Sequence, residues 1–317
     1  MVEVTSRLPA ILTPKLLSTI YHLSVPAPGS SPETLFTRFY GDTDSILTQS
    51  LYDLTVHQVF VPLSQIPSEI WPKDFLCLLP DPATNDFLIQ ALALVLLLDQ
   101  VPQLIFKRHD TRWAYGFFGP LACRLAQQLD GLPPLLRANN VDRWLGLGLG
   151  LSWEDAMLRC SLHLLPFVHA EDLAAQTRAQ TLSETTRKAV EAHFHLHDPS
   201  RHDPRADISH PASLPRLVAG PIPPVYYTGK GYEVFFFFDC QVNRAHVGVL
   251  EKFGRYPWRN APLGRDSTGS EMEYLEEIGD FARMEERVAG EIREDVRRWI
   301  WRPLKGWKDI EAECQGY

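Results

Sequence analysis

Three arginines in one short loop are the residues of this sequence best suited to chemistry. Arg255, Arg259 and Arg265 fall within eleven residues, and Pro257 and Pro262 stiffen the segment between them. Guanidinium groups bind carboxylates or phosphates through paired N–H donors, so the loop could bind an anion. The same arginines could instead hold loop carbonyls and nearby carboxylates, because an irregular loop needs donors for its own backbone. Both interpretations remain open.

Helices are expected on both sides of this loop. The preceding segment has one apolar helical face, formed by Val242, Ala245, His246, Val249, Leu250 and Phe253. Gly254 follows, as expected for a residue that ends a helix in the left-handed conformation. After the loop, Thr268 and Glu271 have the spacing of a capping box, which predicts that a new helix begins there.

A second group of candidates is His169, Glu171 and Asp172. A histidine beside two carboxylates is suited to acid/base catalysis or to metal ligation. The carboxylates could also be structural, because the first turn of a helix favours negative charge. The sequence does not say whether His246 lies near them. No metal is expected, because these residues lack a recognised metal-binding register.

Asp99 and Gln100 interrupt the most apolar segment of the chain, residues 85–106. Residues 85–98 are apolar on almost every side, which predicts a helix buried all round. A carboxylate at the end of such a helix must be paired or hydrogen-bonded. Asp99 is therefore expected to cap a loop, to pair with an arginine, or to act as an acid or base.

Three segments of the sequence together resemble the DUF924 family. LLLDQVPQLIF at 96–106 is similar to the family's LLLDQFPRNIF, and LPFVHAEDLAAQ at 165–176 is similar to LPFMHSEDLADQE. KFGRYPWRN at 252–260, with LGR at 263–265 and Ser-Thr at 267–268, is similar to RFGRFPHRN followed by LGR and ST. The resemblance covers roughly residues 35–195 and 235–280 and implies an all-α, TPR-like fold. It does not supply an activity.

The chain departs from the family pattern at several positions. Gln103 and Leu104 replace Arg-Asn, and Ala170 replaces a serine. Trp258 replaces the histidine of PHRN, which suggests altered chemistry or an aromatic wall for a bulkier, more apolar substrate. No TPR repeat of about 34 residues is visible. The TPR-like fold therefore rests on the resemblance alone.

The domain organisation is expected to be simple. Residues 1–34 are read as a loosely wrapped, proline-rich arm with one short helix, and residues 35–317 as one all-helical domain. Within it, residues 198–231 are an insertion loop, and residues 285–317 are a helical tail. Helices are predicted over 33–60 with a break at 41–42, over 120–130, from Ser152, over 183–197, from Thr268 to about Gly290, and onward to Trp301. Tyr226, Tyr227 and Phe235–Phe238 could line an apolar pocket, but at least two of the four phenylalanines are assigned to the core. Trp299, Trp301 and Trp307 are expected to dock the tail on the body of the protein.

The amino-acid composition limits the classes of protein to which this chain can belong. The 317 residues are 45% hydrophobic and carry a net charge of −8, which supports a packed core and argues against general nucleic-acid binding. Five cysteines without a C-x-x-C pair favour a reducing compartment. The longest apolar run, residues 91–98, is far shorter than the roughly 18 residues of a membrane span, and no secretory signal is visible. A cytoplasmic protein without stable membrane insertion is therefore expected.

Two functions fit these observations. The first is a cofactor-independent enzyme that applies acid/base chemistry to a small anionic or carbonyl-bearing, partly apolar molecule. It would be an isomerase, cyclase, lyase or hydrolase in specialised biosynthesis. The catalytic candidates are His246, His169, Glu171, Asp172 and Asp99, and the substrate-binding candidates are Arg255, Arg259, Arg265, Asn260, Trp258 and Gln100. The alternative is a TPR-like helical module that binds a protein partner without catalysis.

Overall fold

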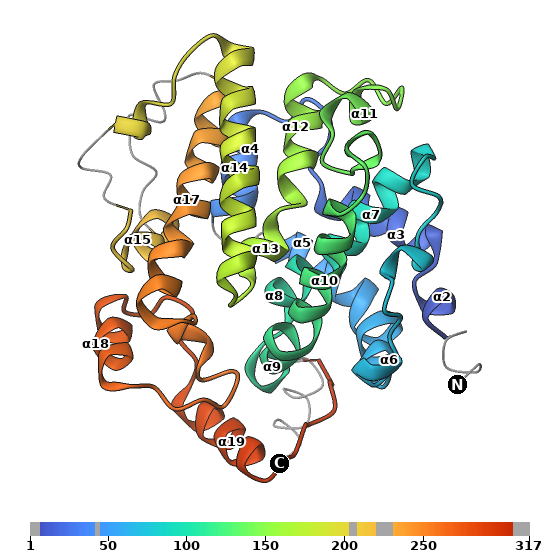
Figure 1. The fold of residues 1–317 in the computed structure, drawn as a ribbon. Coiled ribbons are helices and arrows are strands. Elements are labelled where there is room, and N and C mark those ends of the chain that lie inside the picture. The colour runs from blue at the N-terminus through green and yellow to red at the C-terminus, as the bar shows by residue number, and fades with distance from the viewer. Residues whose placement is uncertain (1–6, 42–44, 203–207, 220–230, 307–317) are drawn as a thin grey trace.

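The computed structural model describes residues 7–41, 45–202, 208–219 and 231–306 (Figure 1). Every regular element in these ranges is helical, which confirms the all-α class, whereas the TPR-like arrangement stays a prediction. The α-helices are α2 (Arg7–Ile11), α3 (Pro14–Ser24), α4 (Pro32–Tyr40), α5 (Ser45–Thr55), α6 (Val61–Ser64), α7 (Asn85–Leu98), α8 (Gln100–Ile105), α9 (Thr111–Trp113), α10 (Gly119–Asp130), α11 (Val141–Leu145), α12 (Trp153–Leu162), α13 (Leu165–His169), α14 (Leu173–Phe194), α15 (Ser213–Ala219), α17 (Tyr232–Phe253), α18 (Gly269–Glu277) and α19 (Glu286–Arg297).

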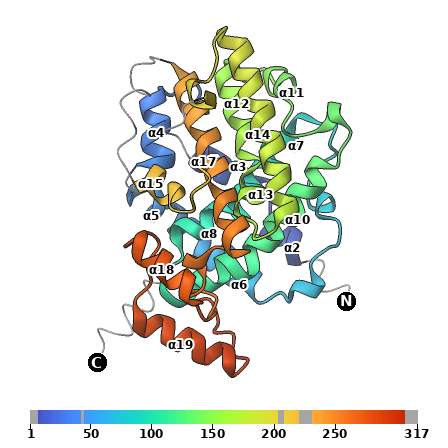
Figure 2. The same ribbon diagram turned by 60° about the vertical axis from the view of Figure 1, so that its left-hand side comes forward.

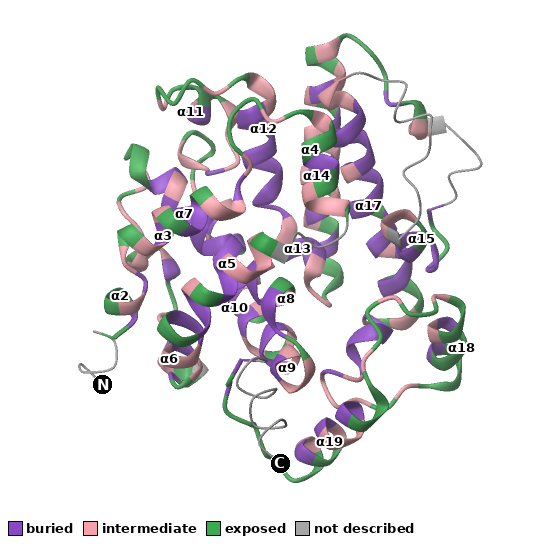
Figure 3. Ribbon diagram, turned by 180° about the vertical axis from the view of Figure 1, so that it is seen from behind, coloured by how far each residue is buried: buried purple, intermediate pink, exposed green. Residues whose placement is uncertain are grey.

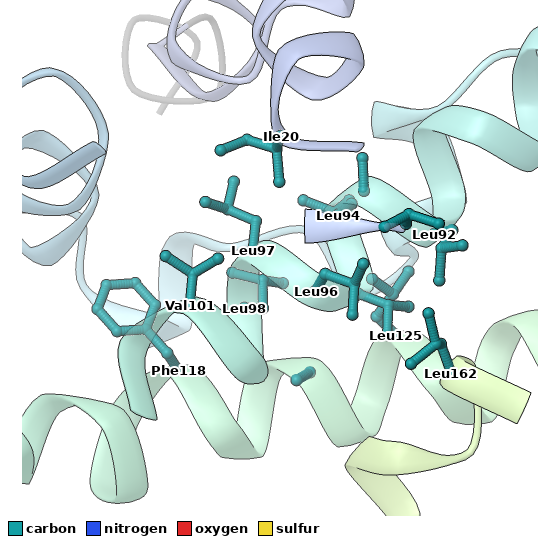
Figure 4. Close-up of a cluster of buried hydrophobic side chains, with 14 of the residues drawn as sticks. Ile20, Leu92, Leu94, Leu96, Leu97, Leu98, Val101, Phe118, Leu125 and Leu162 are labelled. Carbon is teal, nitrogen blue, oxygen red and sulfur yellow. The ribbon is translucent and has the colours of Figure 1, made fainter. Parts of the chain in front are cut away.

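The helix α7 lies at the centre of the core. From Phe87 to Leu98 all its residues but Ile89 are buried, as the all-round apolar sequence predicts. It packs against α3, α10 and α12. Figure 4 shows Leu residues of α7 among side chains from these neighbours, including Ile20 and Leu125.

The segment that contains α7 also has the character of a membrane span. Among the described residues, Asn85–Ile105 is the one helical stretch long and apolar enough for this role. Most of this apolar stretch is buried inside the protein, as it is in a core helix, which can be equally long and apolar.

The two longest helices, α14 and α17, lie side by side and run in opposite directions (Figures 1 and 2). They meet closely: Gln180 Nε2 donates a hydrogen bond to the Asn243 carbonyl over 3.0 Å. All four phenylalanines of α17 at 235–238 are at most 2% exposed, which confirms the assignment of at least two of them to the core. Figure 3 shows the buried residues of α17 and α7 on the inner side of the bundle. This pairing holds α17 in place, and α17 carries His246.

The N-terminal segment is more ordered than the sequence suggested. Residues 7–24 form two helices rather than a loose arm with one, because α3 has an apolar face that covers α7. Leu17 and Ile20 of that face are fully buried. Tyr21 accepts a hydrogen bond from Arg159 Nε over 2.6 Å, which ties α3 to α12.

Several of the helix boundaries that the sequence predicted are confirmed, and one helix is longer than predicted. The helix start at Ser152, the capping box at Thr268 and the left-handed Gly254 (φ +71°) are confirmed, and Ser152 also forms a capping box with Asp155. The helix predicted over 183–197 instead begins at Leu173, with Asp172 as its cap, and ends before a left-handed His195.

The C-terminal helix prediction was wrong in its length. The expected helix from Thr268 to Gly290 is split into α18 and α19, because the chain turns at a left-handed Gly279 (φ +62°). Trp301 packs edge-on against Trp113, with 5.1 Å between the ring centroids, which docks this part of the tail. Trp299 is 95% exposed and does not. Tyr226, Tyr227 and Trp307 lie outside the described residues.

Candidate functional site

A cavity of about 250 Å³ is enclosed mainly by α4, α8, α12, α13 and α17, together with the short 3₁₀ helix Pro257–Arg259. Ligand pockets typically measure roughly 300–1,000 Å³, so its size suits a small molecule. The polar side chains on its wall are Tyr40, Gln100, Gln103, Tyr115, Ser161, His169, Asp239, Asn243, His246 and Arg259. Apolar side chains fill the rest of the wall, among them Leu162, Leu165, Leu214, Val242 and Trp258.

His169 enters this cavity from the end of α13 and is oriented by Asp99. His169 Nδ1 lies 2.8 Å from Asp99 Oδ2, at the junction of α7 and α8. A carboxylate oxygen accepts, so Nδ1 donates and the lone pair of the neutral ring is on Nε2. Gln100 Nε2 also donates to Asp99 Oδ2, over 2.6 Å. This is the arrangement of a base held by an orienting carboxylate.

His246 lies beside His169, with 6.1 Å between the ring centroids. Its Nδ1 donates to the Val242 carbonyl of its own helix over 2.9 Å, so Nε2 is an acceptor. Burial lowers the pKa of His246 to about 3, and the neighbouring His169 and Arg259 act in the same direction. His246 is therefore neutral at physiological pH and suited to accept a hydrogen bond.

Arg259 supplies positive charge to the cavity. It is 7% exposed, and its guanidinium lies over the rings of Tyr115 at 4.5 Å and Tyr256 at 4.8 Å. Nη1 donates to the His169 carbonyl over 2.6 Å, while Nε is buried without a partner among the described residues. No carboxylate of the described chain forms an ion pair with it. Glu171 acts on this guanidinium only through space, without a hydrogen bond. A buried cation with a free donor and no directly bonded carboxylate favours an anionic ligand.

The other two loop arginines do not reach the cavity. Arg265 binds both oxygens of Glu171, at 2.7 and 2.9 Å, and Arg255 binds both oxygens of Glu271, at 2.7 and 2.8 Å. Hydrogen bonds from Arg255 lower the pKa of Glu271 to about 2. The structure therefore gives these two arginines the structural role and leaves Arg259 as the one arginine of the loop that lines the cavity.

Glu171 joins the arginine loop to the end of α13. Besides Arg265, it accepts the backbone N–H of Tyr256 over 2.8 Å. Burial alone would raise the pKa of Glu171, but the bonds from Arg265 and Tyr256 outweigh it and lower that pKa. Tyr256 also donates its hydroxyl to the Val168 carbonyl over 2.6 Å. These contacts hold the loop against His169 and so position Arg259.

Of the remaining candidate residues, one lines the cavity and two support the structure around it. Trp258 lines the cavity and stacks on Tyr256, with 4.8 Å between centroids. Asp172 caps α14 by accepting the Ala175 N–H over 2.7 Å. Asn260 is buried and donates to Ser267 Oγ over 3.1 Å. Asp172 and Asn260 thus support the structure around the cavity and do not line it.

Sequence reasoning missed a second polar group on the cavity wall. Tyr40 donates its hydroxyl to Asp239 Oδ1 over 2.5 Å, and Asn243 Nδ2 donates to Asp239 Oδ2 over 3.1 Å. Burial raises the pKa of Asp239 to about 6, although both of these hydrogen bonds lower it. The available signal was the helical spacing of Asp239, Asn243 and His246, which places all three on one face.

Metal ligation has no ready set of side chains here. In the part of the chain that the structure describes, no three His, Cys, Asp or Glu residues are grouped so as to hold a metal ion. The polar cluster around His169 is instead connected by hydrogen bonds between Asp99, Gln100 and the histidine itself.

Comparisons with known proteins agree with the sequence motifs. The family described as "Bacterial protein of unknown function (DUF924)" matches residues 78–279, which is more than half of the chain and includes the three segments quoted above. The match begins at residue 78, later than the limit near residue 35 that the motifs suggested. Curated proteins and solved structures give no match. The chain belongs to the DUF924 family.

Proposed function

We propose that this chain is a cofactor-independent enzyme that transfers a proton on a small, partly apolar molecule bearing an anionic group. One observation carries the proposal: the oriented imidazole of His169 and the buried guanidinium of Arg259, whose Nε has no partner among the described residues, line the same small cavity. A base and an anion site on one cavity are the two parts that acid/base catalysis on an anionic substrate requires.

In this proposal His169 Nε2 is the base. It takes a proton from the bound molecule, and Asp99 stabilises the imidazolium that forms, as an orienting carboxylate does in other enzymes. The proton then returns from His169 to a different atom of the substrate or to its leaving group. Asp99 contacts the imidazole rather than the cavity, so it is a positioning residue.

Arg259 and His246 would hold the substrate beside this base. The guanidinium pairs with the anionic group and stabilises negative charge that develops when the proton leaves. Neutral His246 accepts a hydrogen bond from the substrate through Nε2. Trp258 supplies an aromatic wall suited to an apolar body.

Proton transfer is the step shared by the reaction types that remain open. An isomerase, a cyclase, a lyase and a hydrolase would each use His169 in this way, and a role in specialised biosynthesis fits the replacement of the family's histidine by Trp258. The alternative is a TPR-like module that binds a peptide. A cavity of about 250 Å³ supports a small molecule over a peptide segment.

The test is a screen for proton exchange. The protein is incubated in deuterated buffer with a panel of small carboxylic and oxo acids, and nuclear magnetic resonance follows deuterium incorporation and conversion. We expect at least one compound to react, with the rate lost in both His169→Gln and His246→Ala. His197→Gln is the matched control, because that side chain is 96% exposed.

Two results would contradict the proposal. One is a reaction that proceeds in His169→Gln and His246→Ala as fast as in His197→Gln, since another group would then move the proton. The other is that no compound binds or reacts while a specific protein partner co-purifies with the chain, which would favour the peptide-binding module.

A further inference from the structure

The cavity has a second polar end that the proposed chemistry does not use. Asp239 lies there between Tyr40 and Asn243, which each donate a hydrogen bond to one carboxylate oxygen. Each of these oxygens keeps a further lone pair, because a carboxylate has about four acceptor sites. All three side chains line the cavity, so these lone pairs are available to a bound molecule.

The charge of Asp239 is not compensated by the protein. Both of its partners are neutral, and no Lys, Arg or His of the described chain forms an ion pair with it. Asp239 is half-buried in the cavity wall. A carboxylate that is partly removed from water and has no cation is costly, so the protein gains most when a ligand supplies the positive charge. The situation at Arg259 is the reverse, because there a buried cation has no directly bonded carboxylate and its Nε has no partner among the described residues.

The two ends are separated by a defined length of helix. Asp239, Asn243 and His246 lie on one face of α17, and seven residues at 1.5 Å each give about 10 Å between Asp239 and His246 along the axis. Arg259 belongs to the His246 end, because its Nη1 contacts the carbonyl of His169, whose ring neighbours that of His246. Between the two ends the wall includes apolar side chains, among them Val242 and Leu162.

We infer that the cavity binds an amino carboxylate in an extended form, with its carboxylate on Arg259 and its ammonium group on Asp239. The inference rests on the proposed function, and it deepens that function by naming the class of substrate. The apolar part of the molecule spans the wall at Val242, and the reacting atom lies toward the carboxylate end, beside His169. A molecule with only one charged group pairs with either Arg259 or Asp239 and leaves the charge of the other side chain without a partner.

The experiment is isothermal titration calorimetry with simple probes. The probes are ω-amino carboxylates from aminobutyrate to aminooctanoate, together with the unsubstituted carboxylates and the alkylamines of the same lengths. We expect one of the longer amino carboxylates to bind best, at least tenfold more tightly than the carboxylate without the amine. Shorter members of the series should lose this advantage, because they cannot reach both ends.

Variants assign each end of the probe to its side chain. In Asp239→Asn the amino carboxylate should bind no better than the plain carboxylate, and Tyr40→Phe should fall between this variant and the parent. Glu251→Gln is the matched control, because it removes an exposed carboxylate from the same helix. Circular dichroism confirms that each variant is folded, so that lost binding is not lost structure.

The outcomes separate this inference from the proposed function. If plain carboxylates bind through Arg259 and the amine adds nothing, the inference is wrong and the proposed anion site stands. If amino carboxylates bind equally to Asp239→Asn and to the parent, the inference is also wrong. If no probe binds, or if binding is unchanged in Arg259→Gln, both the inference and the anion site are contradicted.

Discussion

His169 Nδ1 lies 2.8 Å from Asp99 Oδ2, across 70 positions of sequence, so the end of the most buried helix orients a side chain of the cavity wall. Asp99 is 2% exposed and contacts the cavity wall through this imidazole and through Gln100, whose Nε2 donates to the same Oδ2. The pair therefore separates two tasks. Asp99 fixes the tautomer and the ring orientation, while His169 presents Nε2 to a ligand.

Asp99→Asn tests this division of tasks. The amide keeps the size of the side chain but offers a donor to Nδ1, which favours the wrong tautomer. We expect kcat to fall by about a hundredfold or more, with KM changed little, because substrate contacts remain. Asp86→Asn, at an exposed position of the same helix, is the control. Equal kinetics in the two variants would show that Asp99 only supports the fold.

Arg259→Gln tests the anion site. Loss of a charge-assisted hydrogen bond costs about 1.5–3 kcal/mol, so the affinity for a carboxylate ligand should fall by roughly 10- to 100-fold. Arg244→Gln removes an exposed arginine from α17 and should leave the affinity unchanged. Arg259→Lys keeps the charge and should recover part of the binding. Calorimetry measures all three, and undiminished binding in Arg259→Gln would remove the anion site from the cavity.

Glu171→Gln tests the structural role of the loop contacts. The change breaks a paired contact with Arg265 and should lower the free energy of unfolding at pH 7 by about 1–3 kcal/mol. The pKa of Glu171 is lowered in the folded protein, so its stabilisation is present above pH 4.5 and disappears as the pH falls through the lower folded value. Urea unfolding at pH 7 and at acid pH measures both effects.

The control for this change is Glu273→Gln, which removes an exposed carboxylate from α18. A double-mutant cycle with Arg265→Gln isolates the pair itself. If Glu171→Gln and Glu273→Gln unfold at the same urea concentration at pH 7, the loop is held by other contacts.

His163→Leu tests a buried histidine outside the cavity. Both ring nitrogens of His163 are buried without a partner among the described residues, and burial lowers its pKa to about 3. The unfolded chain binds a proton at His163 below about pH 6.5, whereas the folded protein does not until about pH 3. Wild-type stability therefore falls as the pH drops through this window.

His163→Leu has no imidazole to protonate, so it should not lose stability for this reason as the pH falls. Between pH 6.5 and pH 5 the histidine accounts for about 2 kcal/mol of lost stability, so the variant should lose correspondingly less. His197→Leu changes a solvent-exposed histidine and should follow the wild type. Parallel stability curves for His163→Leu and wild type over this range would mean that His163 is protonated in the folded protein.

The core and several helix boundaries were predictable because their causes are local. The apolar segment around Leu96 has to be buried on every side, and Thr268 with Glu271 satisfies the first N–H groups of a helix by itself. The left-handed Gly254 follows from the same kind of local rule. Each of these features depends on residues within one or two turns.

The arrangement of the site depends on long-range pairing and was only partly predictable. The motifs named both Arg259 and Arg265. Only the tertiary structure shows that Arg265 pairs with Glu171, which lies 94 positions away in the sequence. Asp239 was missed because one polar residue after four phenylalanines looks like the solvent face of a buried helix. Its true surroundings depend on Tyr40, 199 positions away.

The most direct measurement is a crystal structure of the protein with the compound that reacts fastest in the proton-exchange screen. The expected result is a carboxylate within hydrogen-bond distance of the Arg259 guanidinium, with the exchanging carbon beside His169 Nε2. A ligand bound at another surface, or one that lies in the cavity without contacting either Arg259 or His169, would contradict the proposed site.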